Sequence, residues 1–212
     1  DWAGPMGQAL RVIRIDLPGF GLTGPDPTGD YSDTRSIAVV AALMDRLGLA
    51  RASLVGTSMG GRIAWAFAAA HPDRVAKLVL MAPDGFASPG LEYGRAPRVP
   101  AMARLLPYVL PRALLRQTLE AAYADPSRMT EATLDRYADM LLAPGVRRAV
   151  LDRMGAHALV PPEPHLARIT APVLLVWGER DGMVPATNAA DYQRALRESR
   201  LVVFPGIGHV PQ

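Results

Sequence analysis

The residues with the clearest chemical potential are Gly56-Thr57-Ser58-Met59-Gly60, where a serine stands between two glycines directly after an apolar run. A strand that turns sharply into a helix would lift the Ser58 hydroxyl clear of its own backbone, and glycines at positions 56 and 60 leave the room that such a turn requires. The free N–H groups of the following helix would face an oxygen that becomes negatively charged. The pattern therefore predicts Ser58 as a nucleophile and the Met59 N–H as an oxyanion donor.

A serine hydroxyl needs a base to become reactive, and the chain offers four histidines. His209 follows an expected strand at 201–204 and a glycine-bracketed turn, which would deliver it to the carboxyl end of a sheet. His71 precedes a proline at a helix end, and His157 and His165 lie in the middle of the chain, so a capping or solvated role is expected for these three. We therefore predict His209 as the base.

Two aspartates are candidates for the acid that orients the base. Asp181 follows the expected strand 173–177, and Asp84 follows the expected strand 75–81. Asp181 lies in an Asp-Gly pair, so a simple turn role is the alternative for it. We favour Asp181 over Asp84, because its strand immediately precedes the strand of His209.

Strand signals and helical stretches alternate along the chain, which predicts an α/β fold with a mostly parallel sheet and crossover helices. Strands are expected at 11–15, 52–55, 75–81, 173–177 and 201–204, and helices from 32–36 to 48, at 60–70 and at 185–199. Ligands of such sheets bind at the carboxyl ends of the strands, where the residues named above would gather.

Roughly ninety residues without a strand signal separate the expected strands at 75–81 and 173–177. They are too many for a loop, so an inserted helical cap is expected over residues 86–165. Its apolar side chains would roof an acyl pocket or pack the cap's own core, and the second role is favoured. We expect the cap to select the substrate and to contribute nothing to the machinery that handles charge.

The composition excludes several other classes of protein. With 212 residues, of which 50% are hydrophobic, the chain is expected to be globular, and its 22 arginines and one lysine are scattered and form no nucleic-acid-binding patch. No cysteine is present, the histidines lack the spacing of metal ligands, and no cofactor is expected. No signal peptide or membrane-spanning run is visible, so a cytoplasmic location is expected, unless truncation removed a leader.

The sequence resembles the α/β-hydrolase fold superfamily, in its esterase, lipase and carbon–carbon hydrolase branches. The matching pieces span the chain almost end to end: Asp16-Leu17-Pro18-Gly19-Phe20-Gly21, Gly56 to Gly61, His71-Pro72-Asp73-Arg74-Val75, Pro172 to Asp181, and Gly208-His209. The resemblance implies a hydrolase core at 1–85 and 166–212, and the order Ser58, Asp181, His209 is the one expected for the family's triad. It also implies an internal fragment that lacks the N-terminal strands and the loop carrying the second oxyanion donor.

The resemblance implies a serine hydrolase that acts on a small molecule with an apolar acyl group. A carboxylic ester is the first expectation. Two alternatives stay open: the same triad would cleave a carbon–carbon bond next to a ketone in ring-cleavage products, or the chain would be a non-catalytic or truncated binding protein. The sequence leaves the oligomeric state open.

Overall fold

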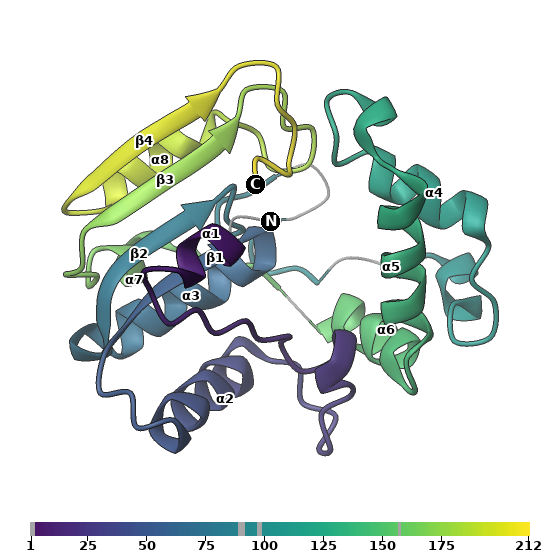
Figure 1. Cartoon of the computed structure of the whole chain (residues 1–212), viewed down its shortest axis with the longest axis horizontal. Coiled ribbons are helices and arrows are strands. Elements are labelled where there is room, and N and C mark those ends of the chain that lie inside the picture. The colour runs from purple at the N-terminus through teal and green to yellow at the C-terminus, as the bar shows by residue number, and fades with distance from the viewer. Residues whose placement is uncertain (1–2, 89–91, 97–98, 157) are drawn as a thin grey trace.

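The computed structural model describes residues 3–88, 92–96, 99–156 and 158–212. Its sheet has four parallel strands in the order β1 (Ala52–Thr57), β2 (Val75–Met81), β3 (Val173–Gly178) and β4 (Ser199–Phe204) (Figure 1). Because all the strands run in one direction, their carboxyl ends share one edge of the sheet. The α/β class with a parallel sheet is confirmed, as are the four strands expected from residue 52 onward.

Helices connect the strands, as parallel pairing requires. These are α3 (Ser58–Ala70), the short α7 (Glu163–Leu166) and α8 (Asn188–Ala195). Before β1 come α1 (Ala3–Gly7), the 3₁₀ turn η1 (Gly21–Thr23) and α2 (Asp33–Arg46), and the 3₁₀ turn η2 (Pro72–Arg74) precedes β2. The Ser32 side chain caps α2 by accepting a hydrogen bond from the Arg35 N–H, and Gly48 with φ of 67° ends the helical segment. The expected helix at 185–199 is shorter in the structure, because β4 already begins at Ser199.

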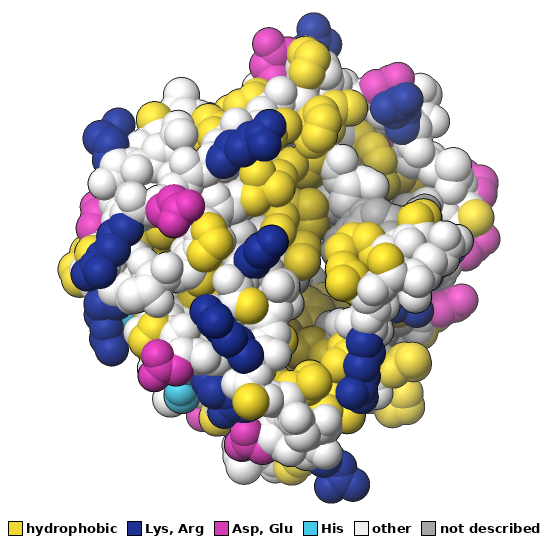
Figure 2. Space-filling model, turned by 60° about the vertical axis from the view of Figure 1, so that its left-hand side comes forward, with side chains coloured by type: hydrophobic (Ala, Val, Ile, Leu, Met, Phe, Trp, Pro, Cys, Tyr) yellow, Lys and Arg dark blue, Asp and Glu magenta, His cyan; other side chains and the backbone are white. Residues whose placement is uncertain are grey.

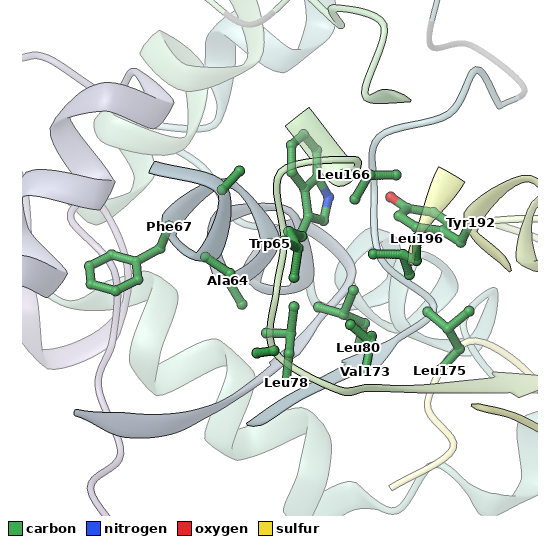
Figure 3. Packing of buried hydrophobic residues seen from close by; sticks show 14 of the residues in the cluster. Ala64, Trp65, Phe67, Leu78, Leu80, Leu166, Val173, Leu175, Tyr192 and Leu196 are labelled. Atoms are coloured by element: carbon green, nitrogen blue, oxygen red, sulfur yellow. The ribbon is translucent and has the colours of Figure 1, made fainter. Parts of the chain in front are cut away.

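The main core lies between α3, α7 and α8 and one face of the sheet. Figure 3 shows Trp65 and Ala64 of α3 above Leu78 and Leu80 of β2, while Val173 and Leu175 of β3 continue the layer toward Tyr192 of α8. Alternate residues of β2 and β3 are fully buried because successive side chains of a strand point to opposite faces. This packing holds the carboxyl ends of β1, β2 and β3 in fixed positions.

The expected strand at 11–15 is wrong: residues 11–17 have no regular secondary structure. A β-strand exists only when a neighbour completes its hydrogen-bond ladder. Within the described residues, β1 pairs with β2 alone, and no strand pairs with residues 11–17. The apolar pattern of residues 11–15 is typical of a strand, but no described strand lies beside these residues to pair with them.

Residues 101–156, between β2 and α7, are here called the insert. They contain η3 (Ala101–Leu105), α4 (Arg112–Glu120), η4 (Pro126–Arg128), α5 (Glu131–Leu142) and α6 (Val146–Ala156). Its helices stand apart from the sheet in Figure 1. They have a small core of their own, made of Leu115, Met129 and Leu134 with Leu110, Leu119, Tyr123, Ala138 and Leu141 packed around it. Part of the insert's apolar surface therefore packs internally, and a cap over residues 86–165 stays a prediction.

Candidate active site

The turn at Ser58 has the backbone geometry that lifts a nucleophile above a sheet. Ser58 has a φ of 51°, a conformation that costs a non-glycine residue about 1–3 kcal/mol, and it is the first residue of α3. A Cβ at Gly56 would collide with the Gly60 carbonyl, and one at Gly61 would come within 2.8 Å of the Pro83 side chain. Gly56 and Gly61 are therefore needed where strand, turn and helix approach one another. A Cβ at Gly60 would meet nothing within 4 Å, so the expected need for a glycine at position 60 is wrong.

Met59 is the second residue of α3, so its N–H belongs to the first turn, where helical N–H groups lack a partner within the helix. The N-terminus of α3 carries the positive end of the helix dipole. An N–H group at this position is placed to stabilise an oxyanion on a carbonyl bound beside Ser58.

The two groups expected to act as base and orienting acid are joined by a hydrogen bond. His209 Nδ1 lies 2.8 Å from Asp181 Oδ2, and both residues are buried. The other oxygen, Asp181 Oδ1, accepts the N–H groups of Met183 and Val184, each at 2.9 Å. The carboxylate is thus held by three partners and fixes which ring nitrogen of His209 points away from it.

Close backbone approach delivers His209 to this position. A Cβ at Gly178, the last residue of β3, would collide with the carbonyls of Ile207 and Gly208. The Arg180 N–H donates to the Ile207 carbonyl at 2.9 Å, which ties the loop after β3 to the loop after β4. The pairing of Asp181 with His209 therefore depends on the backbone of both loops.

Ser58 and His209 come to the same edge of the sheet without a direct hydrogen bond between their side chains in the part of the chain that the structure describes. The Asp84 N–H donates to the Ser58 carbonyl at 3.1 Å. Burial raises the pKa of the Asp84 carboxyl, while Arg62, His209 and the Ser58 hydroxyl act in the opposite direction. Catalytic hydrogen bonds are often long before substrate binds. Of the two acids named from sequence, Asp181 contacts the His209 ring, whereas Asp84 lies beside Ser58.

The insert reaches this edge at two points, which differs from the expectation that it takes no part in handling charge. Arg153 of α6 is buried, and its guanidinium donates to the Pro18 carbonyl and lies 3.3 Å from the Met59 sulfur. After α4, the Ala122 carbonyl accepts the backbone N–H of His209 at 2.8 Å. The insert thus contacts Met59, which is next to Ser58, and the backbone of His209.

Arg153 lies among aromatic side chains and close to a second buried arginine. Its guanidinium stacks on the rings of Phe20 and Tyr31, at 4.6 and 5.3 Å from their centroids. Burial and the neighbouring charge of Arg62 lower the pKa of Arg153. Arg62, one turn along α3 from Ser58, pairs with Asp33 at 3.3 Å. Sequence reasoning missed both arginines, because their partners lie far away in the chain.

The remaining histidines have other surroundings. His71 packs against Phe67 at the end of α3, and the His165 ring lies 6.1 Å from the Trp65 ring. His157 lies outside the described residues. Across the described ranges, no cluster of three or more His, Asp or Glu could hold a metal ion, and none of the described helices is long and apolar enough to span a membrane.

Comparisons with known proteins agree with this geometry. Residues 7–212 match the model of the α/β hydrolase fold family. The chain is 32% identical to a 2-hydroxy-6-oxononadienedioate/2-hydroxy-6-oxononatrienedioate hydrolase of Burkholderia vietnamiensis, over 95% of this chain and 71% of that protein. It is 30% identical to a 2-hydroxy-6-oxo-6-phenylhexa-2,4-dienoate hydrolase of Comamonas testosteroni, over 99% of this chain and 74% of that protein.

A similar structure has been solved for a meta-cleavage product hydrolase, with a TM-score of 0.77 and 25% identity, over 95% of this chain and 74% of that chain. The sequence match, the fold and the named relatives lead to one conclusion. The chain belongs to the α/β hydrolase fold family and is a hydrolase of that family.

Proposed function

We propose that this protein hydrolyses a carbon–carbon bond next to a ketone in a 2-hydroxy-6-oxo dienoate, with Ser58 as nucleophile, His209 as base and Asp181 as the acid that orients His209. The observation that carries the triad is the hydrogen bond between His209 and Asp181, together with the strained backbone of Ser58. The choice of reaction rests on the relatives, whose names describe hydrolases of this class of compound.

In the proposed reaction, His209 accepts the proton of the Ser58 hydroxyl while the Ser58 oxygen forms a bond to the ketone carbon. The Met59 N–H stabilises the resulting oxyanion at the N-terminus of α3. Breaking the bond to the neighbouring carbon leaves an acyl group on Ser58. The departing carbon keeps the electron pair of the broken bond and takes the proton that His209 had accepted, which returns His209 to its neutral form. Water, deprotonated by His209, then releases this acyl group as a carboxylic acid.

The insert would act as a cap that selects the substrate. Figure 2 shows a face of the molecule on which hydrophobic side chains gather around a hollow. In the insert, exposed apolar side chains include Met102, Leu105, Tyr108, Leu114 and Met140. Such side chains would accept an apolar group attached to the ketone, which is the apolar acyl substrate expected from sequence.

Carboxylic esters are the second candidate, because an ester passes through the same acyl-serine intermediate. The decisive experiment compares kcat/KM for a 2-hydroxy-6-oxo-6-phenyl dienoate with kcat/KM for an aryl ester of the same acyl group. We expect the 2-hydroxy-6-oxo-6-phenyl dienoate to be cleaved with the higher kcat/KM. Benzoic acid and the other cleavage product, a shorter dienoate, should appear in equal amounts.

The Ser58→Ala variant is the control for both substrates, because it retains the pocket and lacks the nucleophile. Rapid hydrolysis of the ester without cleavage of the dienoate would replace the proposed reaction by esterase activity. If the folded wild-type protein cleaves neither substrate, the result would support the alternative that the chain is a binding protein.

A further inference from the structure

Helix α6 of the insert packs closely against the segment that precedes α2. A Cβ at Gly145, the residue before α6, would collide with the Pro25 side chain, and a Cβ at Gly19 would come within 3.3 Å of Ala149 of α6. Ala149 and Arg153 lie four residues apart, so they share one face of α6. This face, with Arg153 near its end, is therefore fixed against the segment before α2.

The Arg153 guanidinium connects this segment to the start of α3. It donates to the Pro18 carbonyl, and its Nη1 lies 3.3 Å from the Met59 sulfur. The rings of Phe20 and Tyr31 stack against the guanidinium, and Arg153 is buried. A guanidinium is planar and its N–H donors have fixed directions, so one rigid group sets the position of Met59 relative to Pro18.

Met59 combines a flexible side chain with a backbone N–H that requires a fixed direction. A thioether side chain has three rotatable bonds and adapts to many surroundings. An oxyanion donor, in contrast, must lie about 2.7–3.1 Å from the position that the charged oxygen will occupy. The neighbouring Ser58 has a strained φ of 51°, so the backbone at the start of α3 would relax if its contacts were lost. The contact between Arg153 and the Met59 sulfur opposes such a change.

We propose that Arg153 is a positioning residue for the oxyanion donor, an inference that rests on the proposed function. By holding the Met59 sulfur beside the Pro18 carbonyl, Arg153 keeps the Met59 N–H directed at the oxygen of the carbonyl group that Ser58 attacks. It acts through Met59 and makes no contact with the reacting atoms. The insert then contributes to the stabilisation of charge as well as to the choice of substrate.

The charges around Arg153 also favour an anion at this place. Arg62 follows Met59 by three residues, which puts both on one face of α3, and Arg62 is buried as well. Asp33 forms an ion pair with Arg62 at 3.3 Å, whereas no acidic side chain of the described residues forms one with Arg153. Two buried guanidinium groups therefore share one ion-pair partner, and negative charge on an oxygen at the Met59 N–H would reduce the imbalance.

A purely structural role is the alternative, in which the Arg153 side chain only fastens the insert to the core. The two roles make different predictions about Met59. Met59→Leu removes the sulfur but retains the backbone N–H and nearly the same side-chain volume, a change that protein cores tolerate well. The positioning role requires the sulfur, so substitution of Arg153 should have little further effect in the Met59→Leu protein. The structural role does not depend on it.

The test is a double-mutant cycle on the full chain, with wild type, Arg153→Met, Met59→Leu and the double variant. The rate of Ser58 labelling by a small fluorophosphonate is measured for each protein, together with the urea midpoint of unfolding. We expect each single variant to slow labelling by about tenfold, less than the loss of about 10²-fold that removal of an oxyanion donor causes. The double variant should be slower than either single variant by no more than about twofold, because all three lack the same contact.

Steady-state kinetics and a control variant separate positioning from docking of the insert. With a substrate that the wild-type protein cleaves, Arg153→Met should lower kcat by about tenfold and change KM by less than about twofold, because the contact matters when the oxyanion forms. Arg148→Met makes the same chemical change on the exposed side of α6. It should leave the labelling rate unchanged in both the wild-type and the Met59→Leu protein.

Multiplied effects, about a hundredfold in the folded double variant, would overturn the inference by showing that Arg153 acts independently of Met59. Coupling confined to the urea midpoints would assign Arg153 the structural role instead. If Arg153→Met does not fold, Met59→Leu alone decides, and labelling of that folded variant at the wild-type rate would rule the inference out. Absence of labelling in the wild-type protein is a different result, because it contradicts Ser58 as the nucleophile and thus the proposed function itself.

Discussion

The carboxyl end of the sheet and the insert differ in how their side chains are satisfied. At the sheet edge, Asp181 uses both oxygens and His209 is buried against it. On the insert, apolar side chains such as Tyr108 and Leu114 are exposed, and the ion pairs of Arg112 with Glu131 and Asp135 lie at the surface. The loops at the carboxyl ends of the strands therefore hold Asp181 and His209 in place, whereas the insert offers exposed apolar surface.

Two contacts join the insert to the carboxyl end of the sheet, so the two regions are not fully separate in their roles. Arg153 joins α6 to Pro18 and Met59, and the Ala122 carbonyl holds the His209 N–H. A buried charged group that loses its partners is costly, so the Arg153 contacts are expected to matter more than the surface ion pairs. The insert therefore has two kinds of residue, which mutations can distinguish.

The largest effect is expected from Asp181→Asn at the sheet edge. The amide would favour the wrong tautomer of His209 and lower turnover of either substrate by about 10⁴-fold. Asp84→Asn is the matched change of the other acid, and it should leave ester turnover nearly intact. Steady-state kinetics with an aryl ester make the measurement. A larger loss from Asp84→Asn than from Asp181→Asn would show that the orienting acid has been misassigned.

Arg153→Met should have an intermediate effect. Loss of the guanidinium removes the hydrogen bond to Pro18 and the contact with Met59, and we expect labelling of Ser58 by a small phosphonate probe to slow by about tenfold, which corresponds to about 1.4 kcal/mol. Arg148→Met on the exposed side of α6 is the control. Equal labelling rates in the two variants would restore the expectation that the insert leaves the charge-handling groups untouched.

The smallest effect on reactivity is expected from exposed apolar positions of the insert. Leu114→Trp and Met140→Ala should shift the preference among esters of different acyl length, because these side chains are available to contact substrate. Labelling by the small probe should change by less than about twofold, since exposed substitutions rarely alter stability by more than about 0.5 kcal/mol. Loss of labelling in folded variants would place these residues in the catalytic machinery.

The sequence predicts those parts of the site that depend on local backbone geometry. Glycines around Ser58 and the position of Asp181 and His209 directly after strands are local signals, and the structure brings Asp181 and His209 together. Arg153 carries no such signal, because its contacts with Met59 and Pro18 bridge 94 and 135 residues of sequence.

Secondary structure that depends on distant partners was also not predictable from the sequence. The pattern at 11–15 is that of a strand, yet pairing decides whether a strand forms, and the described chain supplies no neighbour for it. Asp84 is identifiable from its place after β2, but the hydrogen bonds that Trp65 and Tyr192 donate to its backbone carbonyl carry no signal in the sequence. Local geometry was predictable, and the choice between distant partners was not.

Covalent labelling with a fluorophosphonate tests whether Ser58 is the nucleophile of the proposed reaction. Wild-type protein and Ser58→Ala would be treated with a fluorophosphonate, and the modified peptide identified by mass spectrometry. We predict a single phosphonate on Ser58 in the wild-type protein and no labelling of the folded variant. Undiminished labelling of Ser58→Ala, or a phosphonate on another residue of the wild-type protein, would contradict the account.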